Sequence, residues 1–264
     1  MERTKPANRA NITRQGKALS SQEAFKRRYD KSKVLKRTTD INMEQFVFLP
    51  KSITNLSELG IVKSALVVYP VICAEANFDE RTWIQISEAN LSRLTGMNIK
   101  SVREGVGSLV ETDLLSRKME SEGRRHYYIY KPEFVRRDMI DDYHGDYFSF
   151  HRCIITSGVW PNLTLRSKVL YLAIRSQATF DAELYMEIEH GCEKYQANFN
   201  FKSEAYRNRL WDVCDIPLAI LCRMVGIERT NLKSVLKQLE HFGLVEKYGP
   251  TLKVYLKPSL MVRF

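Results

Sequence analysis

The feature that most constrains the fold of this chain is an internal repeat. A shift of 102 residues places apolar positions of segment 46–78 on apolar positions of 148–180. Farther along, a shift of 130 matches 86–114 with 216–244, so the second copy carries 28 additional residues, at about 181–208. Apolar positions that match over both halves of two ~95-residue units predict a duplicated domain.

Each copy contains a short strand, an apolar helix, and then two short helices separated by a glycine. In the first copy Gly96 ends one helix, because glycine adopts left-handed backbone at little cost, and Asn98 is placed to cap the next helix. Apolar residues follow at three- and four-residue spacing, which predicts a helix with one buried face. The second copy repeats this pattern around Gly226, with the later helix expected from about residue 228 to 242.

A β-hairpin follows the helix pair in both copies. Its turn is expected at Glu122-Gly123 in the first copy and at Gly249-Pro250 in the second. A helix-turn-helix followed by a hairpin is a winged helix. The predicted fold is therefore α+β, mainly α: tandem winged helix-turn-helix domains from an internal duplication, with small β-hairpin wings and a basic N-terminal arm.

The expected boundaries follow from this pattern. They are a basic arm at 1–42, a first winged-helix domain at 43–135, an acidic linker at 136–146, and a second winged-helix domain at 147–264 with an insertion at about 181–208. The arm contains a possible helix at 20–37 with a capping-box spacing. The insertion alternates apolar and polar residues on both sides of His190-Gly191, which predicts a β-hairpin. That hairpin is either an interface for another subunit or protein, or a surface excursion.

The basic charge of the chain is concentrated at its start. The net charge is +10, and residues 1–40 hold twelve Lys/Arg against four Asp/Glu. A basic arm on a nearly neutral body favours attraction to a polyanion, most often nucleic acid. Solubility or an acidic protein partner would also explain such an arm.

The outward positions of the second helix in each pair are candidates for contact with double-stranded DNA, because this helix enters the major groove in such motifs. Arg suits guanine, Asn and Gln suit adenine, and Lys suits phosphate. A solvated polar helix face is the alternative. The candidates in the second copy are Arg229, Thr230, Asn231, Lys233, Ser234, Lys237 and Gln238; those in the first copy are Lys100, Ser101, Arg103 and Ser108; the hairpins add Arg124, Arg125, Lys247 and Lys253.

The first recognition helix also contains Gly105 and Gly107, which are unfavourable inside a helix. They indicate either close packing against a partner or DNA, or a copy that reads DNA poorly.

Catalytic signatures are missing from the sequence. No phosphate-binding glycine loop with a following lysine occurs, and the five histidines are dispersed. The five cysteines are scattered without paired spacing, which predicts reduced, mostly buried thiols. We therefore expect a non-enzyme without cofactor or metal. No apolar segment approaches the length of a membrane span and no signal peptide is evident, so we expect a cytoplasmic, nucleoid-associated protein.

The chain resembles the tandem winged-helix replication initiators of plasmids and phages. The resemblance lies in FVFLPKSI, in the apolar helix SALVVYPVICAEANF, and in the ending GLVEKYGPTLKVYLKPSL. It implies binding to repeated sites at a replication origin, local strand opening, self-association on DNA and recruitment of a host replication protein such as a helicase. A transcriptional regulator that uses the same surface is the second interpretation. A protein-interaction scaffold whose winged helices do not bind DNA is the third.

Overall fold

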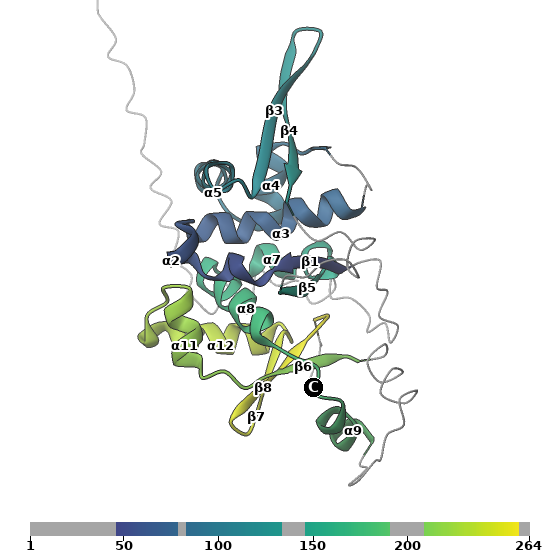
Figure 1. Cartoon of the computed structure of the whole chain (residues 1–264), viewed down its shortest axis with the longest axis vertical. Helices are drawn as coiled ribbons and strands as arrows, with labels where there is room; N and C mark the ends of the chain where they lie inside the picture. Colours follow the sequence, from purple (N-terminus) through teal and green to yellow (C-terminus); the bar gives the residue numbers. More distant parts are fainter. Residues whose placement is uncertain (1–45, 79–82, 134–145, 191–208, 259–264) are drawn as a thin grey trace, which may run out of the picture. The chain divides into compact units, whose positions relative to one another are not determined.

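The computed structural model describes residues 46–78, 83–133, 146–190 and 209–258, all within one compact unit of residues 33–264 (Figure 1). The chain is a mixture of helices and small sheets and is about half helical, which confirms the expected class at this coarse level. The predicted arm, nearly all of the linker and the second half of the insertion lie outside the described residues. None of the helices in these ranges is long and apolar enough to cross a membrane.

The N-terminal half contains one long helix, a pair of shorter helices and a three-stranded antiparallel sheet with the strand order β2-β4-β3. Its elements are β1 (Phe46–Pro50), η3 (Lys51–Thr54), α2 (Leu56–Leu59), α3 (Lys63–Phe78), β2 (Ile84–Gln85), α4 (Glu88–Thr95), α5 (Ile99–Glu111), β3 (Leu115–Glu122) and β4 (Arg125–Pro132).

Apart from helix α9 in the insertion, the C-terminal half has a similar succession of elements, and its sheet has the order β6-β8-β7. Its elements are β5 (Tyr147–His151), α6 (Cys153–Thr156), α7 (Val159–Asn162), α8 (Leu165–Gln177), α9 (Ala182–His190), β6 (Trp211–Cys214), α11 (Leu218–Met224), η5 (Arg229–Asn231), α12 (Leu232–His241), β7 (Val245–Tyr248) and β8 (Thr251–Tyr255). Helices α3 and α8 begin 102 residues apart, and α4 and α11 begin 130 apart. The elements therefore recur at the offsets seen in the sequence.

The insertion begins with a helix rather than the predicted β-strand. Helix α9 starts after Asp181, whose carboxylate accepts the N–H of Leu184 at 3.0 Å. Tyr185 is buried against Trp211, and Leu184 and Ile188 pack on the same cluster. These three residues share one face of a helix. The alternation of apolar and polar residues suggested a strand, but the apolar residues are also compatible with one face of a helix. Trp211, 23 or more residues farther along the chain, provides the apolar surface that this face covers.

Strands β1 and β5 form a ribbon that joins the two halves. Phe46 pairs with His151, and Leu49 pairs with Phe148. At the repeat offset of 102, Phe46 corresponds to Phe148 and Leu49 corresponds to His151. Replacing each residue by its counterpart therefore turns the first pair into the second. The ribbon therefore has the local two-fold symmetry of an isologous dimer interface, although both strands belong to one chain.

Helices α3 and α8 pack against each other beside this ribbon. Residues 65–74 of α3 are fully buried, and so are residues 167–176 of α8. Helix α3 continues through Pro70 without interruption. A helix that is buried all round belongs to the core of a larger unit. Each half therefore supplies part of the other half's core.

The turn glycine of each helix pair contacts the opposite half. A Cβ at Gly96 would overlap the backbone carbonyl of Pro161 in α7. The Nζ of Lys63, at the start of α3, donates to the carbonyl of Gly226 at 2.5 Å. Gly96 and Gly226 have φ values of 68° and 59°, and both are backbone positions that favour glycine. Both helix pairs are thus held by contacts across the ribbon.

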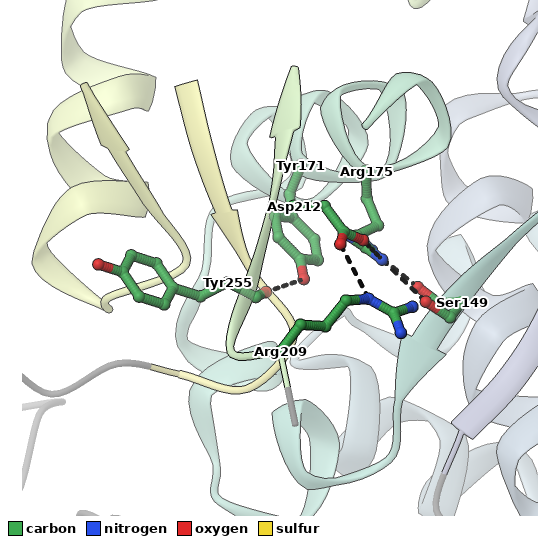
Figure 2. Close-up of polar contacts among 6 residues, drawn as sticks. All are labelled: Ser149, Tyr171, Arg175, Arg209, Asp212 and Tyr255. Carbon is green, nitrogen blue, oxygen red and sulfur yellow. Dashed lines mark hydrogen bonds and ion pairs between the residues drawn. The ribbon is translucent and has the colours of Figure 1, made fainter. Parts of the chain in front are cut away.

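A buried ionic cluster fixes β5, α8 and β6 to one another (Figure 2). Arg175 of α8 donates to Asp212 of β6 at 2.5 Å and to the hydroxyl of Ser149 in β5 at 2.8 Å. Arg209 donates to the other carboxylate oxygen of Asp212 at 3.0 Å. Because buried charges are costly unless they are paired, this cluster favours one arrangement of the three elements.

Gly105 of α5 is required by the close crossing of α5 and α3. A Cβ there would lie 2.8 Å from the carbonyl carbon and oxygen of Ser64, whereas a Cβ at Gly107 would meet no atom within 4 Å.

We expect Gly105→Ala to lower the free energy of unfolding by about 1–3 kcal/mol, since two backbones would have to separate. Gly107→Ala should raise it by ~0.5–1 kcal/mol, because alanine restricts the unfolded chain without a clash. Urea denaturation followed by circular dichroism measures both. Equal effects of the two substitutions would contradict the assigned crossing.

Lys168 of α8 is buried with 1% of its surface exposed, and its ammonium donates to the carbonyl of Leu163 at 2.5 Å. Burial lowers the pKa of Lys168 to about 7. Between that value and the ordinary pKa of 10.5, the unfolded chain holds a proton that the folded chain lacks, so stability rises with pH in this window.

Lys168→Met should remove this rise, which amounts to at most ~1.4 kcal/mol per pH unit. The measurement is the free energy of unfolding of both proteins at several pH values from 7 to 10. Parallel curves for the two proteins would show that Lys168 keeps its proton in the folded state.

Candidate nucleic-acid interface

The geometry of the first helix pair is set by two side-chain caps and a left-handed glycine. Ser87 caps α4 by accepting the N–H of Asn90 at 3.1 Å, and Gly96 ends α4 in the left-handed conformation. Asn98 caps α5 by accepting the N–H of Ser101 at 2.8 Å. The roles predicted for Gly96 and Asn98 are confirmed. The second helix pair differs at the start of its later helix. A 3-10 turn at Arg229–Asn231 precedes α12, and no side chain caps α12.

The N-terminal half of the second recognition helix exposes cations and hydroxyls. Val235 and Leu239 are buried, and the side of the helix opposite to them faces solvent. Two acids border this face: Glu240 in the last turn of α12, and Glu228 directly before η5, whose carboxylate accepts the Thr230 hydroxyl at 3.5 Å. Five predicted residues are exposed here: Arg229, Thr230, Lys233, Ser234 and Lys237. This face suits contacts with phosphates and base edges.

Asn231 and Gln238 differ from the expectation that they face outward. Both are half-buried on the flank of the helix that meets α8. The Gln238 Oε1 accepts the backbone N–H of Thr164 at 3.0 Å and also the hydroxyl of Ser167. The Asn231 Oδ1 accepts from Arg166 at 3.0 Å. The spacing of apolar residues in α12 did not show which side of the helix α8 covers. The expectation that both amides face outward was therefore wrong, since both amide oxygens accept hydrogen bonds from Thr164, Arg166 or Ser167.

Arg166 is a candidate that the sequence did not single out. It lies in the first turn of α8, a helix capped by Thr164 and without acids in that turn. Its side chain is exposed, and its Nη1 donates to Asn231 at the edge of the cationic face. The signal available in the sequence was an arginine two residues after a threonine cap. The packing of α8 against α12 is what places this arginine beside the cationic face.

The recognition helix of the first half is electrostatically different. Lys100 and Arg103 are exposed, but so are Glu104 and Glu111 on the same helix. Arg103 Nε is 2.6 Å from a carboxylate oxygen of Glu88 in α4. This helix therefore presents a mixed surface rather than a cationic one.

Two serines predicted on this helix are also less available than expected. Ser101 is half-buried in the first turn, next to the Asn98 cap. Ser108 is buried, and its hydroxyl accepts the N–H of Val62 at 3.3 Å. Ser108 is thus a contact between helices and was wrongly placed on the outer face.

The hairpins keep three of the four predicted cations exposed. Arg124 and Arg125 lie at the end of the β3–β4 hairpin, and Lys247 is exposed on β7. Lys253, in contrast, is buried on the central strand β8, with its Nζ 4.8 Å from the ring centre of Trp211. Residues 252–255 of β8 are all buried, and the ammonium of Lys253 lies over the Trp211 ring in a cation–π contact rather than in solvent.

The described cysteines are buried and form no disulfides, as predicted. Burial raises the pKa of Cys153 to about 12, so its thiol stays protonated and is a poor nucleophile. Within the described ranges, no group of three His, Cys, Asp or Glu side chains is arranged to hold a metal ion. Cys192 lies outside these ranges.

No family model, no curated protein and no solved structure matches this chain. Its function is therefore inferred from the contacts and charges of its own residues.

Proposed function

We propose that this protein is a sequence-specific double-stranded DNA-binding protein that acts by binding rather than catalysis. In this proposal each half is a winged helix, with α4–α5 and α11–α12 as helix-turn-helix pairs, β3–β4 and β7–β8 as wings, and an internal duplication as their origin. The recurrence of elements at the offsets 102 and 130 supports this interpretation.

The observation that carries the proposal is the exposed face of η5 and α12. Arg229, Lys233 and Lys237 lie there with two hydroxyl residues, and Arg166 of α8 extends the face. The N-terminal part of a recognition helix is the part that reaches base edges in the major groove. Between Arg229 and Lys237 this face has no acid and is bordered by Glu228 at its start, whereas α5 has Glu104 between its cations and its last turn.

The two-fold symmetry of the β1–β5 ribbon bears on the DNA site. Proteins with two-fold related recognition helices bind half-sites in inverted orientation, about one helical turn apart. Because the outer faces of α5 and α12 differ in sequence, the two half-sites should differ too. If the protein binds directly repeated sites at an origin, one chain should bind each repeat. Each repeat should then contain two unequal half-sites in inverted orientation.

Replication initiation at such an array is the biological role that we favour, on the resemblance to plasmid and phage initiators. Footprinting on the DNA element that encodes the protein tests this role. Protection of direct repeats at an origin supports initiation, protection of a promoter indicates a transcriptional regulator, and the absence of protection indicates a protein-interaction scaffold.

Duplexes selected from a random library should contain two unequal, inverted half-sites. Insertion of about five base pairs between them turns one half-site to the opposite side of the duplex, so affinity should fall by at least about tenfold. Insertion of about ten base pairs is the control and should restore part of the binding. Two identical half-sites in direct orientation would contradict the symmetry argument.

Lys237 and Gln238 are neighbours on α12 with opposite expected roles. Lys237→Ala should weaken binding to all duplexes and reduce the slope of log affinity against log salt by about one, with unchanged thermal stability. Gln238→Ala should lower the free energy of unfolding by about 0.5–1.5 kcal/mol, because the Thr164 N–H and two hydroxyls lose this acceptor and water replaces it only in part. Its salt slope should stay as in the wild type. A wild-type salt slope for Lys237→Ala would remove α12 from the interface.

A further inference from the structure

The β3–β4 hairpin is much longer than its counterpart in the second half. Its strands have eight residues each, whereas β7 and β8 have four and five. Figure 1 shows the end of this hairpin beyond the helices of its own half. The outer part of the hairpin, six residues on each strand, is about 20 Å long. A hairpin needed only to close the sheet would end near its base.

The two faces of this hairpin differ in charge. Residues that pair directly across an antiparallel ribbon share a face. One face, here called the acid-free face, consists of Arg117, Met119, Ser121, His126, Tyr128 and Tyr130. Both glutamates of the hairpin lie on the opposite face, which consists of Lys118, Glu120, Glu122, Arg125, Tyr127 and Ile129.

The acid-free face continues outward from the core. At its base Leu115 and Tyr130 are buried. Farther out, Met119 and Tyr128 pair directly with each other, with 63% and 42% of their surfaces exposed. The guanidinium of Arg117 lies 4.8 Å from the ring centre of Tyr128 and holds this ring in place. An exposed apolar pair with a cation at its side is a combination that suits a binding surface.

The chemistry of this face favours a nucleic-acid occupant over a protein one, and this step rests on the proposed function. Arg117 lies beside the apolar pair and Arg124 lies in the turn of the hairpin, while Arg125 is on the opposite face and pairs with Glu122. Proteins that distort duplexes combine such cations with exposed apolar side chains, which enter the minor groove and unstack a base step. The outer part of the hairpin, about 20 Å long, is enough to reach the groove beside the one that a recognition helix occupies.

We propose that the β3–β4 hairpin is a wedge: its acid-free face lies against the minor groove, and Met119 and Tyr128 unstack a base step there. The cations beside them hold the adjacent phosphates. In this arrangement α12 supplies the cationic base-reading face, and the long hairpin of the first half deforms the duplex.

The test is permanganate reactivity of thymines in a duplex selected for binding by the full chain. The wedge variant is Met119→Ser with Tyr128→Ser, and the matched control is Tyr127→Ser, which removes a tyrosine from the opposite face. Wild type and control should make thymines beside one half-site reactive. The wedge variant should lose this reactivity about tenfold while its affinity falls only about threefold. Met119→Gln alone should give an intermediate loss, and equal melting temperatures show that the variants are folded.

Four results would overturn the wedge. Wild-type protein that binds the duplex without reactive thymines, or a wedge variant as reactive as the wild type, would leave the proposed function intact and remove the wedge. A wedge variant with lost self-association in sedimentation would make this face an interface between copies. Wild-type protein that binds no duplex, with α12 variants indistinguishable from it, would remove the proposed function and the wedge together.

Discussion

The packing of α3 against α8, beside the β1–β5 ribbon, is the constraint on which the rest of the structure depends. Both helices are buried all round, so neither half can bury its own apolar residues alone. The two halves expected as separate domains at 43–135 and 147–264 lie in one compact unit. Because a shared core couples the halves, their helix pairs are held at a fixed relation, which two domains on a flexible linker would not have.

Polar groups inside this core select one packing arrangement rather than adding much stability. Arg175 and Arg209 share the single carboxylate of Asp212, and the Nη1 of Arg175 has no hydrogen-bond partner among the described residues. Lys168 is buried on the same helix. An apolar core of similar volume would be at least as stable. The cluster joins β5 of the ribbon to β6 of the C-terminal sheet, and thereby defines where the second helix pair lies relative to the two-fold interface.

The sequence predicted those features that depend on local backbone chemistry. Gly96 and Asn98 were identified because a left-handed turn and a helix cap need particular residues at particular spacings. Features that depend on a distant neighbour were not predictable. Gln238, Ser108 and Lys253 have sequence patterns typical of exposed polar positions, and each is covered by an element that the pattern does not specify. The same holds for α9, whose helical face is chosen by Trp211.

The differences between the halves are as informative as their symmetry. A duplicated unit that bound DNA with two equal faces would need equal charge on α5 and α12. Instead, Arg103 is neutralised by Glu88 and Glu104 is exposed, while α12 has cations at the corresponding end. The half with the weaker helix has the longer hairpin. This inverse relation is expected if the two halves have different roles in the proposed complex, with base recognition in one half and deformation of the duplex in the other. The shared core makes this possible, because binding of α12 to its half-site would fix where the β3–β4 hairpin meets the duplex.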